Sequence, residues 1–294
     1  MMADDSGGHM NVPKELNMMI EKLDALPPIP RIAQKILKLS VITEEGEREL
    51  FNLIEKDPAL MAKIIGLSNS PHFYRGRTVV TLHDAEAVLG SKRIKMTALG
   101  FAMMSSIAKK SSGLLDFDAL WMHSLSIAMA MNTLAGYMPK NRRPPVDAAY
   151  LARLLHDIGF LVLNYIDSKL CDQFCIRMLA KPALPVVEIE AEILDMNHCE
   201  LGSELARHWS LPENITAVLQ YHHTPADNPE EAQQPLVNLA YMAEKLLPAF
   251  DTGEFEPTNI GAAEWQYLGI NPLLADDIIA KVKRHTDQVV EITT

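Results

Sequence analysis

Adjacent histidine and aspartate residues, His156 and Asp157, are the pair in this sequence best suited to chemistry. They follow an apolar run, Ala148 to Leu155, which predicts a buried helix ending near Gly159. At the last turn of a helix both side chains can lean toward one cavity, where a neutral imidazole and a carboxylate suit a divalent cation. An imidazole paired with a carboxylate is also a common structural unit, so the pair alone leaves both interpretations open.

Four more histidines lie at or near predicted helix ends in the same half of the chain. Metal sites in helical proteins are built in this way, from side chains on facing helices that converge inward. Each histidine also has an ordinary interpretation, as a buried side chain with a hydrogen-bond partner or as a cation at a helix C-terminus. The candidate metal ligands are His123, His156, Asp157, His198, His222 and His223.

Composition limits the class of protein. A net charge of -11 argues against a general phosphate-binding surface, so DNA is not an expected partner. No apolar run is long enough to span a bilayer and the start lacks the pattern of a signal peptide, so we expect a soluble, cytoplasmic protein without a membrane partner. The three cysteines, Cys171, Cys175 and Cys199, form no disulfide framework and fit a reducing compartment.

Helical periodicity dominates the chain, and no stretch alternates with period two for any length. We therefore expect an all-α fold with two helical lobes that share a groove. The predicted parts are a flexible leader (1–14), an N-terminal helical bundle (15–110), a second helical lobe with the histidines (115–247) and a helical extension (248–294). The predicted helices cover 15–26, 31–39, 47–56, 58–67, 81–90, 91–107, 117–138, 148–157, 160–166, 186–196, 198–209, 213–223, 236–247, 261–267 and 272–294.

Several separated motifs, in one order over roughly residues 23–223, resemble the HDOD family, a branch of the HD-domain superfamily found in bacterial signalling proteins. The motifs are LPPIP at 26–30, EKDPAL at 55–60, SNS at 68–70, AEAVLG at 85–90, LWMHS at 120–124, LLHDIG at 154–159, HCELG at 198–202 and WSLP at 209–212.

The resemblance implies roles for the histidines. In metal-dependent HD phosphohydrolases and related cyclic dinucleotide phosphodiesterases, metals are held by a first histidine, the His-Asp pair, further histidines and a late aspartate. His123 matches the first histidine, His198 the next, and His222 and His223 the histidines that follow. Such a set suits iron, zinc, manganese or nickel better than magnesium.

Three departures from the HD pattern weaken the case for catalysis. The late aspartate corresponds to Tyr241, with no carboxylate nearby until Glu244. Phe160 replaces a lysine that often follows the His-Asp pair, and Thr224 begins a stretch that lacks the phosphodiesterase signature. Asp157 would then have to bridge the metals alone.

These observations favour a non-catalytic signalling module that binds a partner protein or a small effector, with a degenerate HD site that can still bind metal. The alternative is a metal-dependent phosphohydrolase acting on nucleotides or cyclic dinucleotides. A third possibility is a scaffold without ligand, in which the histidines are ancestral core residues.

Overall fold

The protein is all-α throughout the part of the chain that the structure, a computed structural model, describes: residues 26–70, 73, 76–108, 113–144, 146–181, 184–229, 234–247 and 260–290. The all-α prediction is therefore confirmed. The predicted leader and nearly all of the predicted helix at 15–26 lie outside the described residues. The division into lobes at the stated boundaries stays a prediction.

Local capping explains how the N-terminal helices begin. Asp57 accepts hydrogen bonds from the backbone N–H groups of the first turn after it, and Thr81 accepts one from Asp84, as the sequence predicts. Thr43 caps a helix that begins three residues earlier than expected, through its bond from Gly46. The N-terminal helices are α2 (Arg31–Lys38), α3 (Glu44–Glu55), α4 (Pro58–Asn69), α5 (Leu82–Leu89) and α6 (Ser91–Ala108).

The second half holds the remaining helices, among them α10, which the sequence analysis does not predict. They are α7 (Phe117–Tyr137), α8 (Val146–Leu155), α9 (Ile158–Ile166), α10 (Ser168–Ala180), α11 (Val186–Ile193), α12 (His198–His208), α13 (Glu213–Tyr221), α14 (Gln234–Leu246), α15 (Ala262–Tyr267) and α16 (Ala275–Val290), with the short 3-10 turns η1 (Lys140–Arg142), η2 (Pro225–Asp227) and η3 (Pro272–Leu274).

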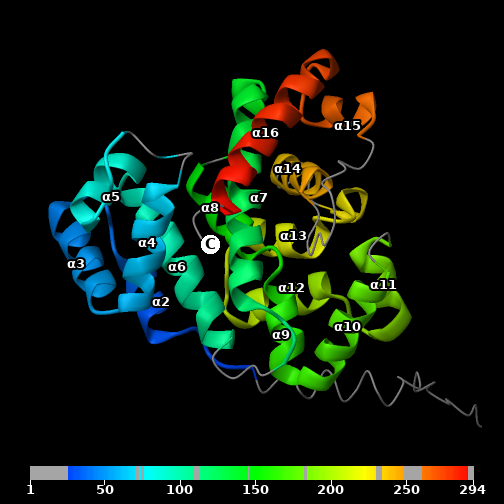
Figure 1. The fold of residues 1–294 in the computed structure, drawn as a ribbon, viewed down its shortest axis with the longest axis horizontal. Helices are drawn as coiled ribbons and strands as arrows, with labels where there is room; N and C mark the ends of the chain where they lie inside the picture. The colour runs from blue at the N-terminus through cyan, green and yellow to red at the C-terminus, as the bar shows by residue number, and fades with distance from the viewer. Residues whose placement is uncertain are drawn as a thin grey trace, which may run out of the picture.

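One continuous apolar core joins these helices, with buried side chains from Leu26 to Val282. Figure 1 shows α2 to α5 gathered at one end and α7 running through the middle of the molecule, where it packs against α8, α14 and α16. The helix α6 packs against α8 and α9, and its Phe101 lies edge-on to Trp121 of α7, with ring centroids 5.1 Å apart. The N-terminal helices thus rest on the helices that carry the histidines.

A break between α8 and α9 places His156 and Asp157 outside regular helix. We expected Gly159 to end a helix, but it lies in the first turn of α9. Close packing explains why this residue is glycine, because a Cβ atom there would lie 1.8 Å from the backbone oxygen of His198. Glycine therefore lets α9 approach the start of α12.

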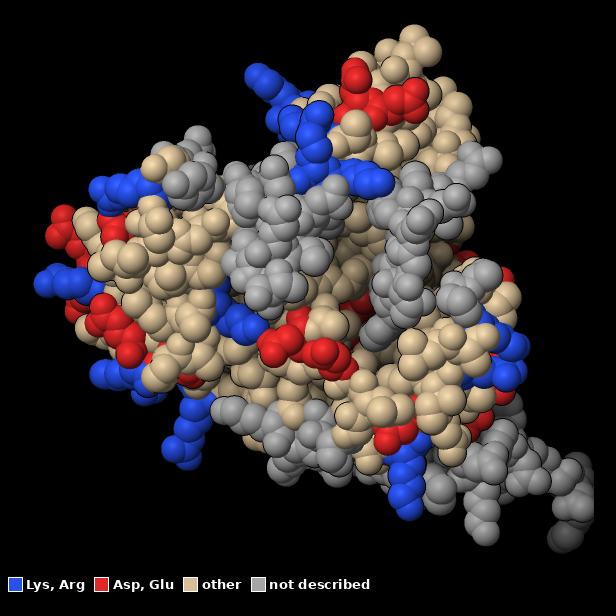
Figure 2. Space-filling view, in the orientation of Figure 1, with Lys and Arg blue, Asp and Glu red and all other residues tan. Residues whose placement is uncertain are grey.

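Acidic and basic side chains are both spread over the face drawn in Figure 2. None of the helices described has the combination of length and apolar character that crossing a bilayer requires.

Replacing Gly159 with alanine tests this close approach. Gly159→Ala should lower the free energy of unfolding by about 3 kcal/mol, because the new Cβ meets backbone rather than a movable side chain. Gly136→Ala is the matched control: Gly136 lies in α7 with no atom within 4 Å of an added Cβ, so alanine should be neutral or stabilise by up to about 1 kcal/mol. Chemical denaturation measures both, and equal effects would refute the packing role of Gly159.

Candidate metal centre

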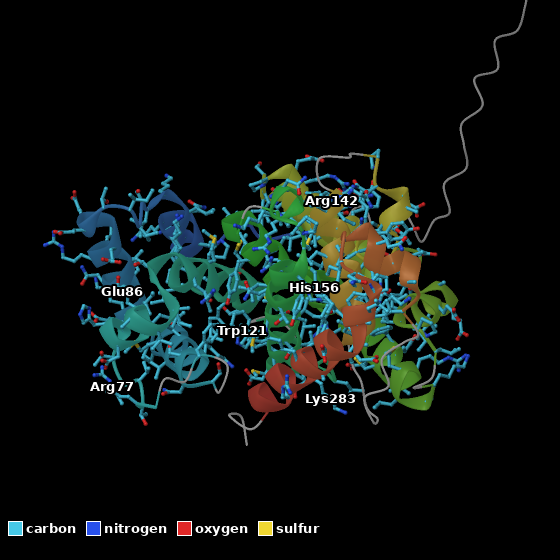
Figure 3. The ribbon with its side chains drawn as sticks, turned by 90° about the horizontal axis from the view of Figure 1, so that it is seen from above. Arg77, Glu86, Trp121, Arg142, His156 and Lys283 are labelled. Carbon is cyan, nitrogen blue, oxygen red and sulfur yellow. The ribbon has the colours of Figure 1, made fainter. Side chains whose placement is uncertain are left out.

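The six predicted ligands come from four places in the sequence and meet in one region. His123 lies on α7, and the His-Asp pair lies at the break after α8. His198 is the first residue of α12, and the last two histidines directly follow α13. Figure 3 shows His156 near the middle of the molecule, away from Arg77, which precedes α5, and from Glu86 of α5.

Asp157 lies at the centre of this region and is fully buried. Its Oδ2 is 3.3 Å from Nε2 of His123 and 3.2 Å from Nε2 of His156. Its Oδ1 is 3.5 Å from Nε2 of both His198 and His222. One carboxylate therefore faces two pairs of imidazoles, one pair with each oxygen.

Glu244, which was not among the predicted ligands, is a further member of the cluster. Its Oε1 lies 2.7 Å from Nε2 of His156 and 3.1 Å from Nε2 of His123, and the residue is 4% exposed. Tyr241, the expected counterpart of the late aspartate, turns away and donates a hydrogen bond to Glu264. The carboxylate that seemed to be missing comes from one turn further along α14.

A signal for Glu244 was present in the sequence. On α14 it follows Val237 and Ala240 at the spacing of one helix face, and both of these residues are buried. A carboxylate in such a face needs partners, because burying an unpaired charge costs too much free energy.

Hydrogen bonds at Nδ1 fix the orientation of the buried imidazoles. Nδ1 of His156 donates to the carbonyl oxygen of Arg153 at 2.9 Å, and Nδ1 of His222 donates to that of Val218 at 3.0 Å. Nδ1 of His198 donates to Glu190 at 2.7 Å, and Glu190 also accepts from the His198 backbone N–H. Glu190, also missed from sequence, thus acts as an outer carboxylate of the kind that orients metal-binding histidines.

With Nδ1 carrying the proton, each neutral imidazole of this set has its lone pair at Nε2, directed at the cluster. These lone pairs face carboxylate oxygens, and Nε2 of His198 lies 3.2 Å from Nε2 of His222. Both oxygens of Asp157 and Nε2 of His156 are buried without a well-aligned hydrogen bond among the described residues. Acceptors that converge in this way require protons or metal cations between them.

The pKa values of the cluster residues also indicate that positive charge is needed between the carboxylates and the imidazoles. Burial lowers the pKa of His123 and His156, but the nearby Glu244 and Asp157 carboxylates outweigh it and raise these pKa values to about 10 and about 9. Burial also lowers the pKa of His222, but the neighbouring Cys199 sulfur and a hydrogen bond with Asp157 outweigh it and raise the pKa to about 9. The histidines in turn hold the pKa values of Asp157 and Glu244 below their usual range, against the effect of burial.

The donor atoms fall into two groups, and within each group all of them lie within 4.8 Å of one another. The first group combines two imidazoles with two carboxylates, and the second combines three imidazoles with a thiol. This chemistry fits divalent transition metals, for which imidazole, carboxylate and thiolate are ordinary ligands. The groups are His123, His156, Asp157 and Glu244, and His198, Cys199, His222 and His223.

Access to the cluster is narrow among the described residues. The side chain of His123 is 13% exposed and His223 is half-buried, whereas His156, His198 and His222 are fully buried. Phe160 stacks on His198, with ring centroids 4.2 Å apart. The position where a lysine was expected thus supplies an aromatic wall.

The HDOD domain family matches residues 26–225 of this sequence. An uncharacterized protein from Treponema pallidum (strain Nichols) is 24% identical over 231 residues, which make up 78% of this chain and 44% of that protein. The chain therefore spans less than half the length of this relative.

Solved structures with the same fold come from several bacteria. An HDOD domain protein of unknown function from Geobacter sulfurreducens aligns with a TM-score of 0.72 and 24% identity, covering 95% of this chain and 98% of that one. A protein provisionally described as a signal transduction protein, from Marinobacter aquaeolei VT8, aligns with a TM-score of 0.75 and 22% identity, covering 95% of this chain and 64% of that one. A protein provisionally described as a phosphohydrolase, from Shewanella amazonensis SB2B, aligns with a TM-score of 0.68 and 20% identity, covering 94% and 98%.

The raised histidine pKa values predict how pH affects protein from which a chelator has removed any metal. An imidazole whose folded pKa is raised stabilises the fold fully below its unfolded value of 6.5, and this contribution disappears as pH rises through about 9 to 10. The Tm of chelated protein should therefore fall between pH 6.5 and pH 10.

Protein loaded with zinc or manganese should not show this fall, because bound metal needs the neutral imidazoles. The control is His83→Gln, which removes an imidazole with a 90% exposed side chain and should leave the profile unchanged. A chelated protein with constant Tm over this interval would contradict the charge arrangement.

Proposed function

The chain belongs to the HDOD family, and we propose that it is a bacterial signalling protein whose HD-type centre binds two divalent transition-metal ions and hydrolyses a phosphoester. The observation that carries the proposal is the arrangement around Asp157. Its two oxygens each face a pair of imidazole Nε2 atoms, at 3.2 to 3.5 Å.

Glu244 supports a working centre rather than a decayed one. The main argument against catalysis was the loss of the late aspartate, which left Asp157 as the single carboxylate. Glu244 replaces that carboxylate, with its Oε1 at 2.7 Å and 3.1 Å from the two histidines that also face Asp157 Oδ2.

These positions indicate which residues would hold each of the two cations. His123, His156 and Glu244 would hold one cation, His198 and His222 the other, and Asp157 would lie between them. Metal ions bound there neutralise charge on a phosphoryl group and activate water as a nucleophile. Glu190 and the carbonyl oxygens of α8 and α13 keep the Nε2 lone pairs directed inward.

A non-catalytic signalling module is the second candidate, and Phe160 favours it. A cationic side chain such as lysine at this position would favour binding of a phosphorylated substrate. Phe160 carries no charge and instead stacks its aromatic ring on His198. In this case the metal would stabilise the helices, and the output would be binding of a partner protein or a small effector. Neither candidate assigns DNA or a membrane as partner.

Metal content and hydrolysis, measured on the same preparations, test the proposal. Wild-type protein should contain two equivalents of transition metal by plasma mass spectrometry and hydrolyse a phosphomonoester or a phosphodiester, including cyclic dinucleotides, with added manganese or iron. Glu244→Gln should lose at least half of the metal and reduce turnover by at least 100-fold, because the amide carries no charge.

Tyr241→Phe is the matched control, since Tyr241 lies on the same helix and contacts Glu264 instead of the cluster. It should leave metal content and turnover unchanged. Metal retained without any hydrolysis would favour the non-catalytic module, and wild-type protein without metal would refute both forms of the metal proposal.

A further inference from the structure

Cys199 is the one member of the second group of donor atoms to which the HD pattern assigns no role as a ligand. It follows His198 directly in the first turn of α12 and is 4% exposed. Its Sγ is 3.4 Å from Nε2 of His198, and it is 3.9 Å from Nδ1 and 4.0 Å from Nε2 of His222. The thiol therefore lies beside both imidazoles that face Asp157 Oδ1.

The separations of these donor atoms match those around a tetrahedral zinc ion. Ligand bonds of about 2.0 to 2.1 Å to nitrogen or oxygen and about 2.3 Å to sulfur place nitrogen and oxygen donors about 3.3 Å apart, and nitrogen and sulfur about 3.6 Å apart. Here the two Nε2 atoms are 3.2 Å apart, and each is 3.5 Å from Asp157 Oδ1. The sulfur separations of 3.4 Å and 4.0 Å lie on either side of the expected value.

Two buried groups without hydrogen-bond partners point to a ligand independently of the thiol. Asp157 Oδ1 is buried without a well-aligned hydrogen bond among the described residues, and it faces both imidazoles of this position. Nε2 of His223 is also buried without a partner, in a ring 5.0 Å from that of His198. A cation at the second position would satisfy Asp157 Oδ1, and a ring nitrogen of His223 lies within 4.8 Å of its other histidine and cysteine donor atoms.

We propose that Cys199 is a thiolate ligand of the second cation position, and that the centre is asymmetric in consequence. The inference rests on the proposed metal centre. The position formed by His198, Cys199, His222 and Asp157 selects zinc or cobalt, because thiolate is a soft ligand. The position formed by His123, His156, Asp157 and Glu244 has no sulfur and suits manganese or iron. Metal binding at the second position releases the thiol proton to solvent.

Cobalt substitution tests the thiolate without any measurement of activity. The protein with the sequence given above is stripped of metal and titrated with Co²⁺, and its absorption spectrum is recorded. Visible d–d bands report cobalt bound at either position, and a thiolate-to-cobalt charge-transfer band in the near ultraviolet reports a sulfur ligand. Wild-type protein should show both kinds of band.

The variants identify the sulfur. Cys199→Ala should keep the d–d bands of the first position, lose the charge-transfer band and bind zinc at least 10-fold more weakly at the second position. Cys175→Ser is the matched control, because Cys175 is a half-buried thiol on α10 and should leave both bands unchanged. Should Cys199→Ala fail to fold, X-ray absorption spectroscopy at the zinc edge of wild-type protein tests the same ligand. It should show one sulfur atom at about 2.3 Å from the zinc ion.

The outcomes separate this inference from the function proposed above. Cobalt d–d bands without a charge-transfer band, a charge-transfer band that survives Cys199→Ala, or a zinc edge without sulfur would overturn the thiolate ligand and leave the metal centre standing. Wild-type protein that binds no cobalt would overturn both.

Discussion

The constraint on which this structure depends is the burial of a carboxylate among imidazoles. Asp157 is fully buried, and each of its two oxygens faces the nitrogens of a different pair of histidines. A buried carboxylate is stable only where positive charge compensates for its lost hydration. In this cluster the compensation comes from protons on the histidines or from metal ions, and the two compete for the same Nε2 atoms.

The fold is arranged to keep those Nε2 atoms in place. Carbonyl oxygens near the ends of α8 and α13 accept the Nδ1 protons of His156 and His222. Glu190 of α11 does the same for His198. The close contact at Gly159 brings α9 against α12, so that Asp157 and His198 lie side by side. Helix ends and one tight packing contact thus determine the chemistry of the centre.

Much of this could be predicted from the sequence, for physical reasons. Helical periodicity predicts the all-α fold, and the ordered motifs predict the HDOD family. The six ligand candidates were visible because histidine and the His-Asp pair are distinctive residue types. Five of these six candidate ligands lie at or next to a helix terminus. The sixth, His123, lies on α7, a helix that packs on the core.

Glu244, Glu190 and Cys199 were not predicted, because their roles depend on tertiary contacts. Glu244 takes the place expected of a residue one turn earlier, and only the direction in which α14 packs on α7 decides between them. In the sequence Glu190 is one of three alternating acidic residues, and only the structure shows that it is buried whereas Glu188 and Glu192 are exposed. Gly159 was taken for a helix end because its contact partner lies 39 residues away at His198.

Anomalous X-ray diffraction from crystals of the protein purified without chelator tests the central claim most directly. The account predicts two anomalous peaks, one on each side of Asp157: the first among His123, His156 and Glu244, the second between His198 and His222. A cluster with the same side-chain arrangement and no anomalous peak, in crystals grown with added zinc and manganese, would contradict it.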